Sequence, residues 1–416
     1  MIHLSNRVFA LAALSCSSAP RQESMAELRA RVIERARVQT MFMDSLLTDG
    51  RCPRTFQGDT LVTSDIGWWC SGFYPGVLWQ VYEATEDTLF RDLAVKHTLP
   101  LAGLLERNTD HDIGFQLMSS FGKMARHLPS GTPSCHSGEP SCHYGEPSCH
   151  SDEPSCHSER SEGISPQTVL TRGAEILAAR LDPAVGVIRS WNGNRWNYPV
   201  IIDNMMNLEL LMEYGDRAVA EKHALTTAAN HFREDGTTWH LVDYADDGSV
   251  LGKQTVQGFA DDSAWARGQA WALYGYAMMA REERKIGNEE LAKTFYEVSA
   301  KLEGWILPRL PEDGVPYWDF SQTDCRDASA GAIIACGLLQ LWEFRGRTPD
   351  DPALAMAERI LRTLASPEYL ADPRTHGGFL LKHSVGSLPG HSEVDVPLTY
   401  ADYYFLEALS LYPSEH

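Results

Sequence analysis

The chain has 416 residues, 43% of them hydrophobic, and a formal net charge of −20. This length and composition predict a globular protein with a sizeable core. The charge and the lack of any basic stretch exclude nucleic acid as a partner. An anionic substrate would have to meet its cations in a focused pocket, because the overall field repels it.

The first twenty residues have the pattern of a short secretory signal. Arg7 precedes an apolar run over residues 8–14, and Cys16 follows that run. A cysteine at this place is typical of the lipidated residue of a lipoprotein signal. We therefore expect residues 1–20 to be a signal or lipoprotein peptide and the protein to be periplasmic or lipid-anchored at Cys16. If these residues are not a signal, a cytoplasmic location follows. No later stretch reaches the roughly 18 apolar residues of a membrane span.

Most of the remaining chain has apolar residues at helical spacing, which predicts an all-α domain built from helical hairpins. The predicted helices cover residues 73–86, 167–181, 204–214, 263–281, 289–304, 328–344, 353–365 and 400–411. Strand-like alternation is confined to short pieces such as residues 238–244, so we expect short strands in loops.

Residues 133–160 hold four near-copies of a seven-residue unit, each with a Cys-His pair. Thiolate and imidazole are usual zinc or copper ligands, so one interpretation is a metal-binding tract. The unit is otherwise rich in Pro, Ser, Gly and Glu, and a period of seven does not match zinc-finger spacing. We predict a disordered insertion at about 129–164 that interrupts a single catalytic domain of residues 25–416. We expect no metal and no cofactor.

Three predicted helices are preceded by a loop that ends in aspartate, namely Asp112, Asp203 and Asp262. A single such aspartate is explained by helix capping. In a closed ring of helical hairpins, however, the inner helices run parallel and their N-termini gather at one rim. Carboxylates and tryptophans would then line one cavity. Such a combination is typical of the active site of a hydrolase that acts on sugars. The available tryptophans are Trp68, Trp69, Trp191, Trp196, Trp265 and Trp271.

These segments resemble glycoside hydrolase family 88, the unsaturated glucuronyl hydrolases. The matching stretches include SGFYPGVLWQVYEAT (71–85), HDIGFQLMSSFG (111–122), YPVIIDNMMNLELL (198–211) and QGFADDSAWARGQAWALYGYA (257–277). The resemblance extends over most of the chain from about residue 30 to residue 411.

The resemblance implies an (α/α)6 barrel and an unusual glycosidase reaction. The substrates are oligosaccharides, such as glycosaminoglycan fragments, whose non-reducing end carries a 4,5-unsaturated uronic acid left by a lyase. The C4=C5 bond is an enol ether: protonation at C4 creates an oxocarbenium-like centre at C5, water adds there, and the resulting hemiketal opens and releases the glycosidic bond.

The resemblance also assigns site residues. Asp203 matches the family's general acid and base, and Asp112 matches its second functional aspartate. Gln257 and His240 correspond to residues close to the double bond and the substrate.

Arg267, Trp265 and Trp271 fall in the block that shapes the pocket around the uronate, and Arg267 is expected to hold the substrate carboxylate. For Asp203 to be protonated near neutral pH, its pKa must be raised. We expect a like charge from Asp112 and desolvation by tryptophans to raise it.

Two other functions fit parts of the sequence. The related unsaturated rhamnogalacturonyl hydrolases share the barrel and the hydration chemistry. A non-catalytic glycan- or metal-binding periplasmic protein, in which the Cys-His repeat is the functional part, is the third alternative. The 257–277 block and the presence of Asp112, Asp203 and Gln257 favour the glucuronyl hydrolases.

Overall fold

The computed structural model describes residues 21–48, 50–107, 110–128 and 165–413. The predicted signal residues and the Cys-His repeat lie outside the described residues. The α-helices are α1 (Met25–Leu46), α2 (Phe73–Thr85), α3 (Thr88–Thr98), α4 (Ile113–Leu117), α5 (Lys123–His127), α6 (Pro166–Ala178), α7 (Leu208–Tyr214), α8 (Arg217–Asn230), α9 (Ala266–Lys285), α10 (Glu289–Ile306), α11 (Ala328–Phe344), α12 (Pro352–Leu364) and α13 (Thr399–Leu411). Shorter helical segments are the 3₁₀ helices η1 (Leu99–Glu106), η3 (Ile202–Asn207), η4 (Leu307–Arg309) and η5 (His376–Gly378), and the π-helical turn η2 (Met118–Gly122).

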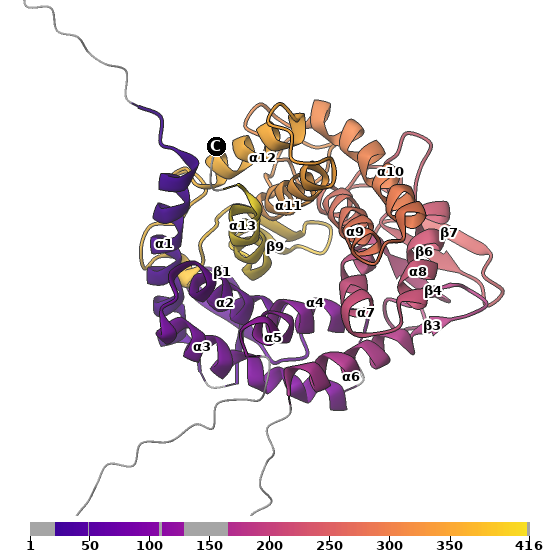
Figure 1. The fold of residues 1–416 in the computed structure, drawn as a ribbon, viewed down its shortest axis with the longest axis horizontal. Coiled ribbons are helices and arrows are strands. Elements are labelled where there is room, and N and C mark those ends of the chain that lie inside the picture. The colour runs from indigo at the N-terminus through magenta and orange to yellow at the C-terminus, as the bar shows by residue number, and fades with distance from the viewer. Residues whose placement is uncertain (1–20, 49, 108–109, 129–164, 414–416) are drawn as a thin grey trace, which may run out of the picture.

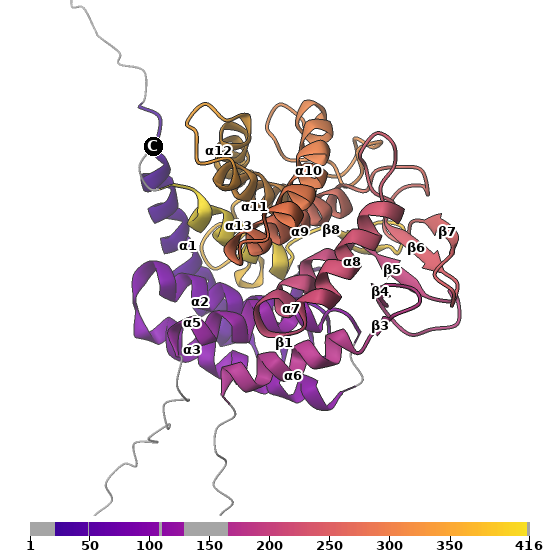
Figure 2. The same ribbon diagram turned by 45° about the vertical axis from the view of Figure 1, so that its right-hand side comes forward.

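The helices form two concentric rings, which confirms the predicted (α/α)6 barrel. The outer ring holds α1, α3, α6, α8, α10 and α12, and the inner ring holds α2, α4 with α5, α7, α9, α11 and α13 (Figure 1). Successive helices alternate between the rings, so each outer helix and its inner neighbour form a hairpin (Figure 2).

Burial explains which helix joins which ring. In α11, every residue from Ala328 to Trp342 is buried, because its apolar and small side chains leave no polar face. The outer helix α12 buries only one stripe of its surface, including Leu354, Ile360 and Leu364. All-round apolar helices therefore form the wall of the barrel, and amphipathic helices cover them.

The strands lie in the loops between helices, as predicted. They are β1 (Cys52–Gln57), β2 (Thr60–Ser64), β3 (Leu181–Asp182), β4 (Val187–Ile188), β5 (Pro199–Ile201), β6 (Leu241–Tyr244), β7 (Val250–Gln254), β8 (Ser384–Ser387) and β9 (Ser392–Val396). All pairings are antiparallel, and β5, β6 and β7 form a three-stranded sheet. This sheet matters for the site because Asp203 follows β5 and His240 precedes β6.

Gly114 brings two of the inner segments together. A Cβ atom on this residue would lie 2.5 Å from Oδ1 and 2.6 Å from Cα of Asn207. Only glycine therefore allows the start of α4 to pack against η3. This contact places Asp112, directly before α4, close to Asp203 in the first turn of η3.

Candidate active site

Asp203 lies in the first turn of η3, where the predicted helix of residues 204–214 begins as a 3₁₀ segment. The backbone directly before it is fixed by neighbouring loops. Ile201 N–H donates to Ser190 Oγ at 2.9 Å, and Ile202 N–H donates to the His240 carbonyl at 2.9 Å. The Asp203 side chain is only 13% exposed, and its Oδ2 has no hydrogen-bond partner among the described residues.

His240 faces Asp203 with its Nε2 atom, 3.7 Å from Asp203 Oδ2. Its other ring nitrogen, Nδ1, accepts hydrogen bonds from the backbone N–H groups of Val256 at 3.0 Å and Gln257 at 3.2 Å. A nitrogen that accepts two N–H groups carries no proton, so the hydrogen of the neutral ring is on Nε2. Burial, with a contribution from the Arg267 charge, lowers the pKa of His240 to about 3. His240 therefore presents a neutral Nε2–H donor toward Asp203.

Three buried polar atoms meet at this point without hydrogen-bond partners among the described residues. They are Asp203 Oδ2, His240 Nε2 and Trp271 Nε1. Buried polar groups are normally hydrogen-bonded, and the exceptions mark sites that a ligand or water completes. Two of them are N–H groups beside the third: His240 Nε2 lies 3.7 Å from Asp203 Oδ2, and the Trp271 indole acts on the Asp203 carboxyl as a donor that lowers its pKa.

The pKa of Asp203 is raised to about 7, and the main cause is burial. The Arg267 charge, a backbone hydrogen bond and the Trp271 indole all lower it, without cancelling the effect of burial. Repulsion between carboxylates affects Asp112 and not Asp203. The pKa of Asp112 is raised well above its usual range by burial, then by the charges of Asp110 and Asp203. Desolvation of Asp203 was predicted correctly, whereas the repulsion between the two aspartates raises the pKa of Asp112.

Asp112 is the residue that directly precedes α4, yet its side chain caps no backbone N–H of that helix. Its Oδ1 lies 3.4 Å from Nε2 of the buried His111. The carboxyl group is therefore not used for helix capping, and it lies within the electrostatic reach of Asp203.

Gln257 lies beside the same group of atoms. Besides its backbone contact with His240, its side-chain Nε2 donates to the carbonyl of Gly386 in β8 at 3.1 Å. Gln257 thus connects the Asp203–His240 pair to the β8–β9 hairpin.

Comparison with known proteins agrees with this arrangement. The chain is 37% identical over 358 residues to an unsaturated glucuronyl hydrolase of Formosa agariphila. The aligned region covers 82% of this chain and 79% of that protein. It is 31% identical to an unsaturated glucuronyl hydrolase of Bacillus sp. strain GL1, over 86% of this chain and 90% of the relative.

The chain belongs to the unsaturated glucuronyl hydrolases. A crystal structure of a member described as specific for heparin superposes with a TM-score of 0.80 at 36% identity, over 93% of this chain and 97% of that one. No family model matches the sequence. The protein is therefore a glycosidase, and the alternatives of a non-catalytic protein and of a rhamnogalacturonyl hydrolase are not favoured.

Two tryptophans predicted to bind substrate are buried beside His240 and Asp203. Trp265 is 3% exposed, and its ring packs on His240 at 4.6 Å and under the Arg267 guanidinium at 4.6 Å. Trp271 is fully buried against Phe115, and only its Nε1 is directed at Asp203. Neither ring offers an exposed face on which a sugar could stack, so both act through the polar groups that they support.

Arg267 also differs from its prediction. Its side chain is 2% exposed and forms an ion pair with the fully buried Asp327 at 3.1 Å. It further donates to the carbonyls of Val385 and Gly386 in β8. The guanidinium is thus bound to the chain's own groups, and it influences Asp203 through its charge and through the hairpin that it holds.

The third predicted aspartate does not join the site. Asp261 and Asp262 are both exposed, and Oδ1 of Asp261 accepts the Thr255 N–H at 2.8 Å. Asp261 and Asp262 lie four and three positions before Trp265, the residue that directly precedes α9, so neither aspartate is at the N-terminus of this inner helix.

One side chain near the site was not singled out from the sequence. Tyr400, at the start of α13, has a buried hydroxyl without a hydrogen-bond partner among the described residues. Its ring lies 4.7 Å from that of Trp69 and 5.4 Å from the Arg267 guanidinium carbon. Tyr400 lies in a stretch that resembles the family, but only its position in the fold indicates its proximity to Arg267.

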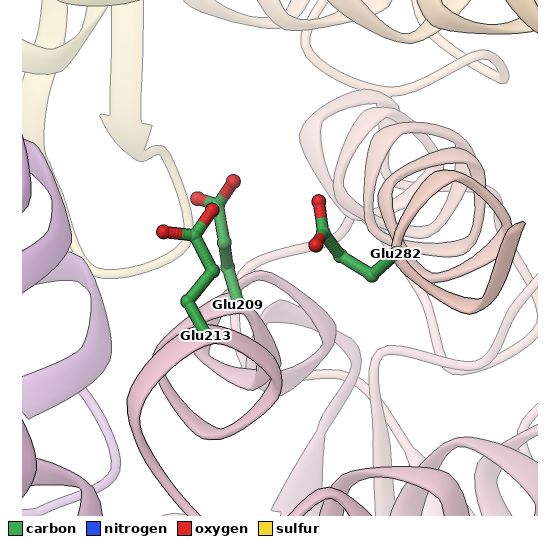
Figure 3. Close-up of side chains that lie close together, drawn as sticks. All are labelled: Glu209, Glu213 and Glu282. Carbon is green, nitrogen blue, oxygen red and sulfur yellow. The ribbon is translucent and has the colours of Figure 1, made fainter. Parts of the chain in front are cut away.

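An acidic cluster elsewhere in the barrel could be mistaken for a metal site. Glu209 and Glu213 on α7 and Glu282 on α9 have carboxylate oxygens within 4.8 Å of one another (Figure 3). Arg281, however, pairs with Glu209 and Glu282 at 2.7 Å each, and Lys285 pairs with Glu282 at 2.7 Å. These two cations pair with Glu209 and Glu282, and burial together with the Glu209 charge raises the pKa of Glu213, so the cluster is an ion network between two inner helices.

Proposed function

We propose that this chain removes the 4,5-unsaturated uronic acid from the non-reducing end of lyase-generated, glycosaminoglycan-type oligosaccharides, with Asp203 as the proton-transfer residue. The observation that carries this proposal is the buried Asp203 carboxyl, with a pKa of about 7, facing a neutral His240 Nε2–H. A carboxyl with this pKa holds a proton at neutral pH and can also accept one.

The steps follow from the chemistry of the enol ether. Protonated Asp203 gives its proton to C4, and the C4=C5 electrons form the new C–H bond. This leaves a cationic C5 stabilised by the ring oxygen. The Asp203 carboxylate then takes a proton from the water that attacks C5. The hemiketal opens, the bond to the next sugar breaks, and Asp203 is again protonated.

The neighbouring groups have supporting tasks in this proposal. The Nε2–H of His240 and the indole N–H of Trp271 supply donors beside the reacting carboxyl and stabilise its charged form after proton transfer. Gln257 lies between this pair and the β8–β9 hairpin and contacts the uronate. A protonated Asp112 adds no negative charge to a pocket that must accept the uronate carboxylate.

The pH dependence of kcat/KM tests the state of Asp203. Only its protonated form can start the reaction, so we expect kcat/KM to fall above about pH 7, tenfold for each further pH unit. His240 has a pKa of about 3, so it stays neutral over the measured pH range and adds no further change to the pH profile of kcat/KM. The measurement is the loss of double-bond absorbance between roughly pH 5 and 9. Activity that rises with pH through 7 would mean that Asp203 must start the reaction as a base.

The substrate is tested with a panel of unsaturated disaccharides from heparin, chondroitin, hyaluronan and rhamnogalacturonan. Relatives of this chain are described as specific for heparin or as unsaturated chondroitin disaccharide hydrolases. We therefore expect turnover of glycosaminoglycan disaccharides and none of the rhamnogalacturonan product. Cleavage of the last compound alone would contradict the proposed substrate class.

We also infer that the protein is exported, on the basis of residues 1–20. None of the helices in the described part of the chain is long and apolar enough to cross a bilayer. A mature protein that begins at Cys16 with an attached lipid would support a lipid-anchored form, and an intact N-terminus would contradict export by cleavage.

A further inference from the structure

A chain of three contacts behind Asp112 fixes where its neighbouring hydrogens lie. The backbone N–H of Phe115 donates to Asn207 Oδ1 at 2.7 Å, so the Asn207 Nδ2 group must face the other way, as a donor. This Nδ2 lies 3.5 Å from His111 Nδ1. The Nδ1 of His111 is therefore the acceptor, and the hydrogen of the neutral ring is on Nε2.

The Nε2–H of His111 faces Asp112 Oδ1 at 3.4 Å, and the His111 side chain is 2% exposed. The arrangement repeats the one at Asp203, where two backbone N–H groups fix the His240 tautomer and Nε2 faces the carboxyl. Each aspartate of the site is thus faced by a neutral imidazole whose proton position is set by the groups behind it.

We propose that His111, with its tautomer fixed by Asn207, is a positioning residue that keeps Asp112 Oδ1 as an acceptor and so confines the Asp112 proton to Oδ2. This inference rests on the proposed function. Its effect on the reaction is to hold Asp112 neutral in one orientation, as an O–H donor rather than as a second negative charge beside Asp203 and the uronate.

The surroundings of the pair agree with a neutral imidazole. Burial and the Arg180 charge lower the pKa of His111 to about 4, although Asp110 and the Asn204 side chain raise it. The same Asp110, together with Asp203, raises the pKa of Asp112, and Arg180 lowers it. His223 on α8 is a further imidazole near His111, and its pKa is lowered to about 3 by burial. His111 is therefore neutral at neutral pH, and its surroundings favour the protonated form of Asp112.

The substitution Asn207→Asp tests the chain of contacts without changing its shape. While the introduced carboxyl is protonated, it can accept from Phe115 and donate to His111 as asparagine does. Once it is ionised, it favours a proton on His111 Nδ1. The imidazole then becomes either the other neutral tautomer, with no hydrogen on Nε2, or a charged imidazolium. Both changes alter which oxygen of Asp112 carries its proton, or whether it carries one. We expect the ratio of variant to wild-type kcat/KM to fall by at least about tenfold from pH 5 to pH 9. The probe is the panel disaccharide that the wild type cleaves fastest. A ratio independent of pH would overturn the inference.

A second pair of variants keeps the test decisive if Asn207→Asp does not fold. Glutamine at position 111 can place an amide N–H where Nε2 lies, whereas asparagine is too short. We expect His111→Gln to keep about tenfold more kcat than His111→Asn. Equal losses in the two variants would mean that His111 acts only through packing.

The matched control is His223→Gln. His223 is equally buried, and its Nδ1 also accepts a backbone N–H, from Ile188 at 2.9 Å, but its Nε2 has no hydrogen-bond partner among the described residues. We expect this variant to lose stability and to keep the wild-type pH profile. Activity in Asp203→Asn would contradict the proposed function. If Asp203→Asn is inactive but the ratio of Asn207→Asp to wild-type kcat/KM does not change with pH, the positioning role of His111 is contradicted and the proposed function is not.

Discussion

Replacing Asp203 with asparagine is expected to lower kcat by about 10³- to 10⁴-fold, because the variant has no proton to give to C4 and no carboxylate to activate water. The amide has nearly the shape of the carboxyl, so substrate binding and KM should change little. Stopped-flow or steady-state loss of the double-bond absorbance measures the effect. A variant that retained more than about a tenth of the wild-type kcat would contradict the role of Asp203.

The same substitution should stabilise the fold at alkaline pH. A carboxyl whose pKa is about 7 in the fold and 3.8 in the unfolded chain lowers the free energy of unfolding by about 4 kcal/mol once it is ionised in both states. The penalty is absent below about pH 4, develops between the two pKa values and is complete above pH 7. The amide and the protonated carboxyl are both neutral, so we expect Asp203→Asn to gain up to about 4 kcal/mol at pH 8 and almost nothing at pH 4. Urea unfolding at the two pH values measures this.

Asp402 provides the control for this stability effect. Burial raises its pKa to about 8, but its two oxygens accept the N–H groups of Leu380 and Leu381 at 2.8 Å each. At pH 4, where both carboxyls are protonated in the fold, the NH₂ group in Asp402→Asn would face one of these donors and could not accept from it. The variant should therefore lose about 1–3 kcal/mol at pH 4, where Asp203→Asn changes almost nothing, and keep its activity per folded molecule. A loss at position 402 and none at position 203 at this pH would show that the Asp203 carboxyl makes no hydrogen bond on which the fold depends.

The sequence predicted the features of the site that depend on local pattern and ring topology. Asp112 and Asp203 each lie at the start of an inner helical segment, and a closed ring of hairpins brings such starts to one rim. Residues 238–244 contain β6, whose pairing with β5 brings His240 next to the residue before Asp203. These relations follow from periodicity and from the order of elements along the chain.

The features that the sequence did not predict depend on contacts between distant segments. Arg267 was assigned to the substrate carboxylate, but its partner Asp327 lies 60 residues further along the chain and the β8 carbonyls more than 110. The cause of the Asp203 pKa also required the fold, since like-charge repulsion and burial produce the same shift and only distances separate them. For the same reason, the proton positions of His111 and His240 cannot be read from any motif.

Removing Arg267 tests the buried ion pair and its influence on the site together. In Arg267→Met the carboxylate of Asp327 keeps its hydrogen bonds from Ser329 but loses its only ion-pair partner among the described residues, so we expect a loss of about 3–5 kcal/mol in the free energy of unfolding. The double variant Arg267→Met/Asp327→Asn removes both charges and keeps a side chain suited to cap α11, so it should recover about half of this loss or more. Equal stability of the single variant and the wild type would contradict the energetic role of the pair.

The folded double variant also reports on the pKa of Asp203. The Arg267 charge lowers that pKa, so its removal should raise it, and the fall of kcat/KM should move to higher pH than in the wild type. The β8 carbonyls lose their guanidinium at the same time, which frees the hairpin that Gln257 contacts and should raise KM. A fall of kcat/KM at an unchanged pH, together with a higher KM, would mean that Arg267 acts on the site only by holding the hairpin. A fall at lower pH would contradict the assignment of the alkaline limb to Asp203.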